Sequence, residues 1–212
     1  MAVSREFVRR LGSSRFNYWF GYVANLGLVA WLWGRALVGG RPQLSWAMAL
    51  ACAVGGLLSW TLSEYLLHRY VYHVWPSFLS VGHDLHHRQP KALIGVPWWL
   101  STAVVLAVYQ LVSLAFDPAA TGVIMGFNWL GYVAYCLAHH GSHHWSLRLR
   151  YFRQIKRAHL LHHAYPDYNW GFTTPLWDIL FGTRFPDDVA PPRGRRPKKV
   201  LHSAEPTRIV AP

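Results

Sequence analysis

Long apolar segments alternate with polar, basic stretches along this chain, and each segment is long enough to form a membrane-spanning helix. Such a helix needs about 20 mostly apolar residues. The segments that meet this length lie at about 18–38, 44–67, 94–116 and 121–138. Short breaks at 39–43 and 117–120, the second marked by Asp117-Pro118, predict two helical hairpins. The pattern therefore predicts an all-α integral membrane protein with about four transmembrane helices.

Basic residues are distributed unequally around these segments. Lys and Arg total 21 against 9 Asp and Glu, so the formal net charge is +12. All Lys and Arg residues except Arg35 and Arg41 fall on the side of the predicted helices that carries both termini. Because cytoplasmic loops are enriched in Lys and Arg, both termini are predicted to be cytoplasmic. The basic residues flank apolar segments rather than a soluble fold, so no nucleic-acid partner is expected.

The chain divides into three parts on composition. Residues 1–16 form a basic cytosolic N-terminus, and residues 17–185 form one membrane-embedded domain. Residues 186–212 contain the run PPRGRRPKK, which is expected to be disordered because it has almost no apolar residues. Cys52 and Cys136 lie inside apolar segments and are interpreted as small buried hydrophobes.

All of the 13 histidines except His202 fall in four groups at the ends of the apolar segments. On the predicted topology, the groups share the cytoplasmic side and form a helical cap. They read His68-x4-His73, His83-x2-His86-His87, His139-His140-x2-His143-His144 and His159-x2-His162-His163.

The spacing within these groups favours metal binding. Residues three and four apart lie on one face of a helix, so His83, His86 and His87 are expected to share a face. Imidazole is the commonest metal ligand among side chains. A structural zinc ion needs only four ligands, so ten or more histidines predict two metal ions. A set rich in imidazole suits iron, zinc, copper or nickel rather than magnesium or calcium.

Few carboxylates lie near the histidines. Glu64, Asp84 and Asp178 are interpreted as groups that orient the ring N–H groups of the ligands rather than as ligands themselves. Asp178 is also a candidate to fix a loop that covers the site. No catalytic residue separate from the metal ligands is expected.

These motifs resemble those of the integral-membrane fatty acid hydroxylase superfamily, which includes fatty acid 2-hydroxylases, sterol desaturases and C4-methyl sterol oxidases. The resemblance runs from about Thr61 to Thr183. It comprises EYLLHRYVYH, HDLHH, GYVAYCLAHH and HLLHHAYPDYNWGFTTPLWDILFGT. The last block, in which HxxHH precedes GFTTPLWDILFGT, is the most specific.

The resemblance implies a set of ten metal ligands. Two alignments of the third group are possible. Matching GYVAY favours His139 and His143, and counting back from His159 without a gap favours His140 and His144, which are kept as possible additional or alternative ligands. We take the first, because a loop tolerates a gap better than a helix does. The implied ligands are His68, His73, His83, His86, His87, His139, His143, His159, His162 and His163.

The resemblance also implies the chemistry. Members of the superfamily use two metal ions, functionally iron, with O2 as co-substrate to hydroxylate or desaturate a lipid; zinc can occupy such a site in isolated protein. A fatty acyl chain is the expected substrate, and a sterol or carotenoid is the alternative. Aromatic residues are candidates to line the path of the lipid to the metals: Tyr65, Tyr135, Trp170, Phe172 and Trp177.

Two electrons must come from a separate protein, because the chain has no CxxC motif and no Gly-rich dinucleotide loop. A ferredoxin or a cytochrome b5-like donor is expected. A zinc hydrolase is disfavoured because no HExxH element occurs. A membrane carrier of metal or haem remains the alternative outside enzymes, although such a carrier should have ionisable residues along its spans.

Overall fold

The computed structural model describes residues 14–38 and 44–186, and every regular element within these two ranges is helical. The prediction of an all-α protein is therefore confirmed for this part of the chain. The predicted break at 39–43, most of the N-terminal segment 1–16 and the tail from residue 187 lie outside the described residues.

Each of the predicted apolar segments forms a helix. A π-helix, η1 (Leu67–Val74), directly continues the second of these. Shorter helices carry the remaining histidines and the chain beyond them: α4 (Phe78–Arg88), α7 (Arg150–Ala164) and α8 (Leu176–Leu180). The long helices are α2 (Arg15–Val38), α3 (Trp46–Leu66), α5 (Trp98–Val112) and α6 (Pro118–His144).

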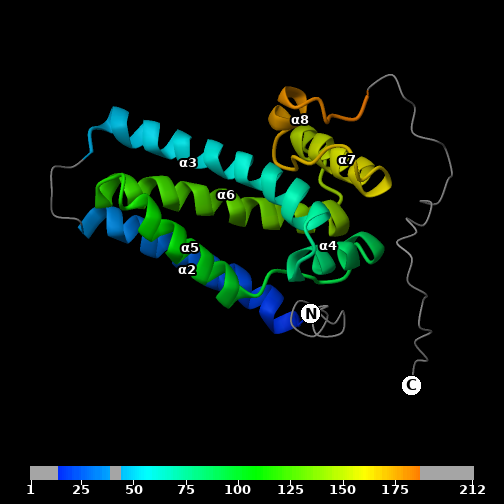
Figure 1. Cartoon of the computed structure of the whole chain (residues 1–212), viewed down its shortest axis with the longest axis horizontal. Helices are drawn as coiled ribbons and strands as arrows, with labels where there is room; N and C mark the ends of the chain where they lie inside the picture. The colour runs from blue at the N-terminus through cyan, green and yellow to red at the C-terminus, as the bar shows by residue number, and fades with distance from the viewer. Residues whose placement is uncertain (1–13, 39–43, 187–212) are drawn as a thin grey trace.

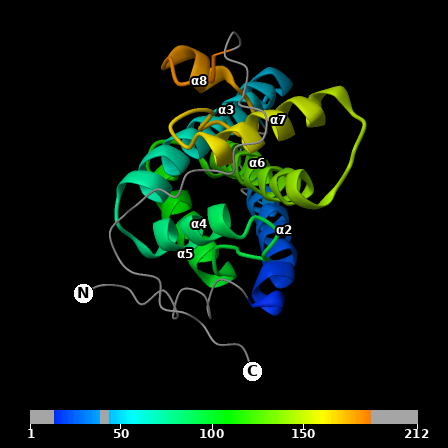
Figure 2. The same ribbon diagram turned by 90° about the vertical axis from the view of Figure 1, so that its right-hand side faces the viewer.

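The four long helices lie side by side in an elongated bundle, and α4, α7 and α8 gather at one end of it (Figure 1). Helix α6 is the central helix, because it packs against all three other long helices and most extensively against α3 and α2. Figure 2 shows the bundle turned so that the end with the short helices faces the viewer. The ends of η1 and α6 and the whole of α4 and α7 therefore meet at one end of the bundle.

Local sequence signals set several helix ends. Ser45 accepts a hydrogen bond from the Met48 backbone at the start of α3. Asp117 caps α6 in the same way, and Pro118 follows at the first helical position. Helix α4 begins with a capping box between Ser77 and Ser80. These caps fix the residues at which α4 and α6, two of the helices that carry histidine groups, begin.

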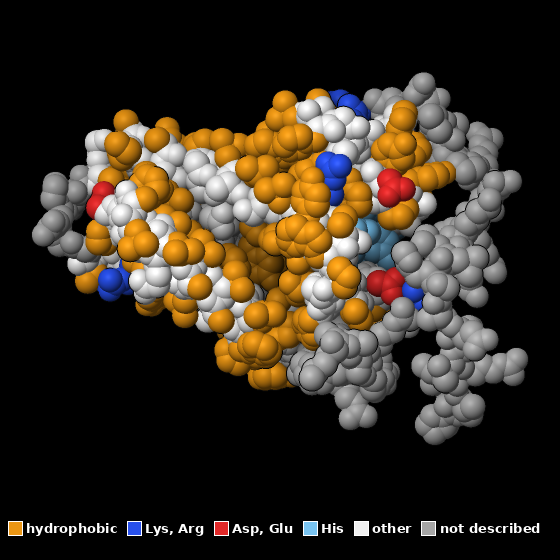
Figure 3. Space-filling model, viewed as in Figure 1, with side chains coloured by type: hydrophobic (Ala, Val, Ile, Leu, Met, Phe, Trp, Pro, Cys, Tyr) orange, Lys and Arg blue, Asp and Glu red, His pale blue; other side chains and the backbone are white. Residues whose placement is uncertain are grey.

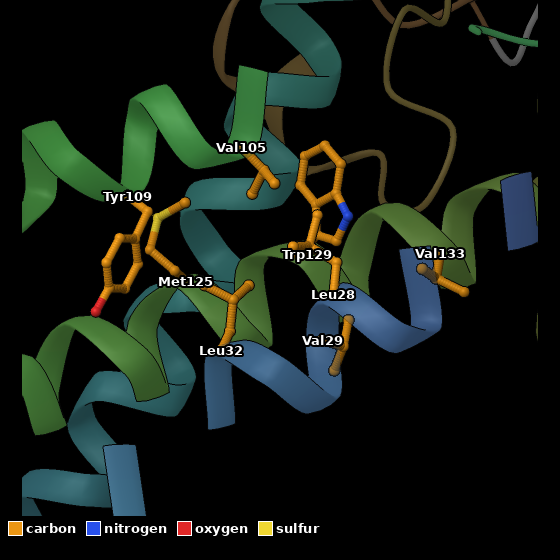
Figure 4. Close-up of a cluster of buried hydrophobic side chains, with 8 residues drawn as sticks. All are labelled: Leu28, Val29, Leu32, Val105, Tyr109, Met125, Trp129 and Val133. Carbon is orange, nitrogen blue, oxygen red and sulfur yellow. The ribbon is translucent and has the colours of Figure 1, made fainter. Parts of the chain in front are cut away.

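A buried apolar cluster joins α2, α5 and α6 (Figure 4). A polar network runs through the same region. Asn25 Oδ1 accepts hydrogen bonds from Trp129 Nε1 at 2.9 Å and Ser101 Oγ at 3.3 Å. Asn25 Nδ2 donates to the Gly21 carbonyl at 2.6 Å. Since one side chain on each helix takes part, this network fixes the three helices together.

Two glycines permit the close approach of other helices to α6. A Cβ atom at Gly56 of α3 would lie 2.4 Å from the Ile124 carbonyl oxygen. A Cβ atom at Gly122 of α6 would lie 2.7 Å from the Leu32 carbonyl oxygen of α2. Both distances are shorter than any tolerated contact, so the helix backbones meet here without intervening side chains.

The structure bears on the predicted membrane spans in part. Within the described residues, two helical stretches are long and apolar enough to cross a membrane, Trp46–Val74 and Pro118–His144. Helix α5 has 15 residues, which at 1.5 Å per residue is about 22 Å, less than the hydrocarbon thickness of about 30 Å. The four predicted spans are therefore helices, but four complete crossings are not confirmed.

The surface of the bundle is apolar over much of its length (Figure 3). Only 11% of the apolar window of the stretch Trp46–Val74 is buried, and Trp46 and Leu50 of α3 are 89% and 66% exposed. A helix that is hydrophobic all round is normally buried in a core or in a membrane. Its exposure here is consistent with contact to lipid.

Candidate metal centre

Ten histidines converge at the end of the bundle and form two groups of five. Within each group, one ring nitrogen from every histidine lies within 4.8 Å of the others. We call these groups site 1 and site 2. Site 1 comprises His68, His73, His83, His87 and His162, and site 2 comprises His86, His139, His143, His159 and His163.

Distances between Nε2 atoms fit ligands that surround one ion. In site 1, His83 Nε2 lies 3.1 Å from His68 Nε2 and 3.0 Å from His87 Nε2. In site 2, His159 Nε2 lies 2.8 Å from His143 Nε2 and 3.1 Å from His163 Nε2. Two nitrogens bound at about 2.1 Å and at right angles are about 3.0 Å apart.

Hydrogen bonding leaves at least one of these nitrogens without a partner. A neutral imidazole has one N–H donor and one acceptor nitrogen, so converging rings can pair with one another only through a mixture of tautomers. His139 Nε2 is buried and has no hydrogen-bond partner among the described residues. A cation in each group would satisfy these atoms, so the residues present fit two metal ions.

Helices α4 and α7 each contribute to both sites. Helix α4 provides His83 and His87 to site 1 and His86 to site 2. Helix α7 provides His159 and His163 to site 2 and His162 to site 1. In each HxxHH motif, the outer histidines thus belong to one site and the middle histidine to the other. The prediction that all three histidines share one face is correct only for the outer pair.

The rings of His87 and His163 stack where the two sites meet. Their centroids are 4.3 Å apart and their planes differ by 23°. The two groups are therefore neighbours in one centre rather than separate sites.

The π-helix explains the five-residue step between His68 and His73. In an α-helix these side chains would point about 140° apart at 100° per residue. The wider turn of η1, in which the Trp75 N–H donates to the Tyr70 carbonyl five residues earlier, brings them to one side. The ring centroids of His68 and His73 lie 5.2 Å apart.

His140 and His144 lie on a different face of α6. Their rings stack on each other with centroids 4.3 Å apart, and neither is in site 1 or site 2. His140 Nδ1 is 2.9 Å from the hydroxyl of Tyr18 on α2. The structure thus brings His139 and His143, and not His140 and His144, into contact with the other eight histidines.

The segment after α7 orients two of the rings. His68 Nδ1 lies 2.6 Å from the Trp170 carbonyl oxygen, and His162 Nδ1 lies 2.8 Å from the Tyr168 carbonyl oxygen. A carbonyl only accepts hydrogen bonds, so each Nδ1 carries the proton and each Nε2 presents its lone pair to site 1.

Residues 168–174, which we call the closing loop, also cover the two sites. The Trp170 ring packs against His73 with centroids 4.8 Å apart, and the Phe172 ring packs against His159 with centroids 5.1 Å apart. Both aromatic residues are buried. One segment therefore covers site 1 and site 2 on the same side.

Two buried carboxylates hold the closing loop in place. Glu64 accepts hydrogen bonds from the backbone of Phe172 and from the backbone and hydroxyl of Thr173. Asp178 accepts from the backbone N–H groups of Trp170 and Gly171, each at 2.8 Å. Asp178 thus fixes the loop that covers the sites, which was one of the two roles expected for it. Glu64 also acts on the histidines through the loop, whereas direct contact with a ring N–H group was expected.

Asp84 is placed differently. It is exposed on α4 and forms an ion pair with Arg88 at 3.1 Å. This is an ordinary surface pair between residues four apart on a helix. The structure shows Asp84 in contact with Arg88, whereas a contact with a histidine ring N–H group was expected.

Burial keeps the histidines of α4 and α7 neutral. Desolvation, reinforced by the neighbouring histidines, lowers the pKa of His87 and of His163 to about 3. The same causes lower the pKa of His83, His86 and His159 well below the ordinary value. Only a neutral imidazole can bind a metal ion, so both groups are prepared for cations at neutral pH.

A cavity of about 130 Å³ opens beside the two sites. It is lined by one face of α2, by η1 and α4, by residues 94–96 and by α6, and it reaches His83, His86 and His139. On the same measure of cavity volume, a single water needs about 10–15 Å³, so the cavity has room for part of a larger molecule. A hollow lined by hydrophobic side chains is visible in the middle of the face shown in Figure 3.

The aromatic residues expected along the lipid path are only partly there. Tyr135 lines the cavity, together with Tyr18, Tyr22, Tyr72 and Tyr132, which the sequence reasoning missed. The other expected residues serve the closing loop and α8. Trp170 and Phe172 cover the sites, the Tyr65 hydroxyl lies 3.0 Å from Thr183 Oγ1, and Trp177 Nε1 donates to Thr61 Oγ1.

Comparison with protein families and known proteins gives a consistent result. The family model described as fatty acid hydroxylase matches residues 53–183. A dihydroceramide fatty acyl 2-hydroxylase of Arabidopsis thaliana is 35% identical over 153 residues, which cover 67% of this chain and 62% of that protein. The ceramide very long chain fatty acid hydroxylase of Schizosaccharomyces pombe is 34% identical over 158 residues, covering 68% of this chain and 45% of that protein.

The fold is also similar to a solved structure. Full-length scs7p, in which only the hydroxylase domain is visible, matches with a TM-score of 0.70 and 29% sequence identity. The match covers 86% of this chain and 71% of that chain. The fatty acid 2-hydroxylase of Rattus norvegicus is 32% identical over 64% of this chain and 40% of its own length. The chain thus spans about 40–62% of the length of the curated relatives named here.

Proposed function

The chain belongs to the fatty acid hydroxylase family, and on this premise we propose that it is a membrane-bound oxidoreductase that hydroxylates or desaturates a lipid with O2. The observation that carries the proposal is the pair of five-histidine groups beside a cavity with aromatic walls. The proposed substrate is a fatty acyl chain, because the relatives named above are fatty acyl hydroxylases.

We propose that the ten histidines of site 1 and site 2 are the ligands of two iron ions. When bound, iron in such a site supplies the activation of O2 and the attack on an unactivated C–H bond. Zinc also suits an imidazole set and is expected to occupy the site in some preparations. His140 and His144 are assigned no ligand role in this proposal.

The contribution of the protein is to position the substrate and to exclude water. The cavity would hold the lipid chain with its reacting carbon next to His83, His86 and His139. Trp170 and Phe172 would keep water from the far side of the histidines, since both rings are buried against them. The hydrogen bonds of Glu64 and Asp178 would keep the closing loop in this position.

Insertion of one oxygen atom of O2 into a C–H bond, with reduction of the other to water, consumes two electrons and two protons. We propose a separate ferredoxin or cytochrome b5-like protein as the electron donor. Arg150, Arg153 and Arg157 are exposed along α7, the helix that also carries three of the proposed ligands. A basic face of this kind would attract an acidic carrier.

We further propose that the histidine end of the bundle lies at the cytoplasmic surface, with the two helical hairpins inserted in the bilayer. The basic residues on this side of the chain support the orientation. A lipid could then reach the cavity from the membrane. A cysteine-accessibility measurement with a membrane-impermeant reagent at position 154 would test the orientation, because Gln154 is exposed on α7.

The function is tested by two measurements, one on the purified protein and one on cells that make it. Metal analysis of the purified protein is expected to find two metal ions per chain, with iron supporting activity. Lipid analysis of cells that make the protein, compared with cells that make a variant carrying His86→Ala and His162→Ala, is expected to find a hydroxylated or desaturated acyl product only in the former. A sterol or carotenoid product would favour the alternative substrates. Bound metal or haem without any lipid product would favour a carrier and refute the enzyme.

A further inference from the structure

One stripe of α2 forms a wall of the cavity. The residues of α2 that line it are Asn17, Tyr18, Gly21, Tyr22 and Asn25. Each of them lies three or four positions from at least one other, so they form one continuous face of the helix. Gly21 lies in the centre of this face, and it is the one position of the five without a side chain.

The ends of the stripe define the direction of the cavity. Tyr18 contacts His140, the neighbour of His139 in site 2, through its hydroxyl at 2.9 Å. Asn25 accepts a hydrogen bond from Trp129, ten residues earlier on α6 than His139. The cavity therefore runs along α2 from the histidines toward Asn25. Eight residues of helix correspond to about 12 Å, with Gly21 halfway.

The space in front of Gly21 is open. A Cβ atom at Gly21 would have no heavy atom of another residue within 4 Å, apart from its chain neighbours and the helix backbone. By contrast, a Cβ atom at Gly95, which also lines the cavity, would already touch the Tyr18 ring at 3.4 Å. A side chain at position 21 would thus project into the cavity without disturbing the packing of α2.

We propose that Gly21 is a specificity-determining position that sets how long an acyl chain the cavity accepts beyond the metal histidines. This inference rests on the proposed function. The acyl chain lies along α2 with its reacting carbon at the end near His139, and its more distant methylenes pass Gly21 toward Asn25. The absence of a side chain at this midpoint leaves a continuous path for a long chain.

The proposal predicts a graded effect of side-chain size. Each methylene that loses its place in an apolar cavity weakens binding about fourfold. Gly21→Ala should therefore weaken the binding of a sixteen-carbon fatty acid about fourfold. Gly21→Leu, which adds four carbons, should weaken it on the order of 100-fold. A four-carbon fatty acid, which ends before position 21, should bind all three proteins within about twofold.

The matched control is Gly27→Leu. Gly27 lies on the same helix, a Cβ atom there also meets nothing within 4 Å, and the residue is exposed and does not line the cavity. Binding is measured on the metal-loaded full-length chain by competition of saturated fatty acids against a fluorescent fatty acid. Metal content and thermal unfolding of each variant report whether the fold is intact, and Gly21→Ala keeps the test informative if Gly21→Leu does not fold.

Selective loss of the long chain in the Gly21 variants, with no change in Gly27→Leu, supports the proposal. Equal loss for both chain lengths, or no loss in Gly21→Leu, overturns it. The binding assay needs no turnover, so its outcome is separable from the proposed activity. If the wild-type protein makes no product but the binding series shifts as expected, the proposed reaction fails and the role of Gly21 stands.

Discussion

Replacing His139 with Ala should remove metal from site 2, whereas replacing its neighbour His140 with Ala should not. The two residues are adjacent on α6, and each is paired with a histidine four residues later, His143 or His144. Only His139 and His143 have a ring nitrogen within 4.8 Å of the other nitrogens of site 2. The pair of variants therefore compares chemically identical changes on the same helix.

The expected magnitudes follow from the contacts. Without His139, site 2 keeps four nitrogens, enough to hold a metal ion but more weakly. Loss of a residue that merely orients a ligand costs about 10–100-fold in metal affinity. Loss of a ligand should cost at least about 100-fold, which corresponds to about 2.8 kcal/mol. His140→Ala loses one hydrogen bond, to Tyr18, and should lower the free energy of unfolding by about 0.5–1.5 kcal/mol.

The assay is metal analysis after dialysis against a chelator that buffers free metal about tenfold above the wild-type dissociation constant. Wild-type protein and His140→Ala should keep both ions, and His139→Ala should keep about one. Thermal unfolding with and without metal gives the stability of each variant separately. Equal loss of metal from His139→Ala and His140→Ala, with both proteins folded, would refute the division of the histidines into these two sites.

Three further changes test other parts of the structure. Glu64→Gln should lower the free energy of unfolding by about 1–3 kcal/mol, because an amide cannot accept all the hydrogen bonds that the closing loop donates to the carboxylate. The control is Asp84→Asn at an exposed position, which should change the free energy of unfolding, measured by thermal unfolding, by less than about 0.5 kcal/mol. Gly56→Ala should lower the free energy of unfolding by about 1–3 kcal/mol through overpacking against α6. Gly55→Ala, where a Cβ atom meets nothing within 4 Å, should not lower it, because Ala favours a helix interior over Gly. In acid, the unfolded chain takes up protons at its histidines near pH 6.5, whereas His87 in the fold does so only near its pKa of about 3. The contribution of His87 to the free energy of unfolding is therefore fully present above pH 6.5 and is lost as the pH falls from 6.5 to about 3. Metal release should then coincide with loss of helical circular dichroism. Metal release near pH 6.5 from a protein that remains helical would contradict this account.

The positions of the long helices could be predicted because each one carries a long run of apolar residues. The start of α6 was marked by Asp117-Pro118, which form its cap and first position. The start of α5 was predicted four residues too early, at 94, because residues 94–97 are apolar but not helical. Pro97 was the available signal, since it disfavours a helical conformation in the residue before it.

The set of ten clustered histidines could be selected from spacing and resemblance, but neither its division into site 1 and site 2 nor the closing loop could be predicted in this way. Its anchors connect distant parts of the chain, since Glu64 on α3 binds the backbone of Thr173 across 109 residues. No periodic pattern encodes such a pairing. The polar residues Asn17 and Asn25 in an otherwise apolar segment were a signal for the cavity wall, because polar side chains in such a segment are expected to turn inward.

The division of each HxxHH motif between two sites follows from the geometry of a helix. At 100° per residue, the first and last histidines are about 40° apart, and the middle histidine lies about 60° to the other side of the first. Two residues can therefore face one ion while the third faces its neighbour. Helices α4 and α7 make this division in opposite senses, so each site receives two histidines from one helix and one from the other. The separation of the two sites is thus built into two rigid helices rather than into loops. This is the precision that a pair of metal ions acting together on one substrate would require.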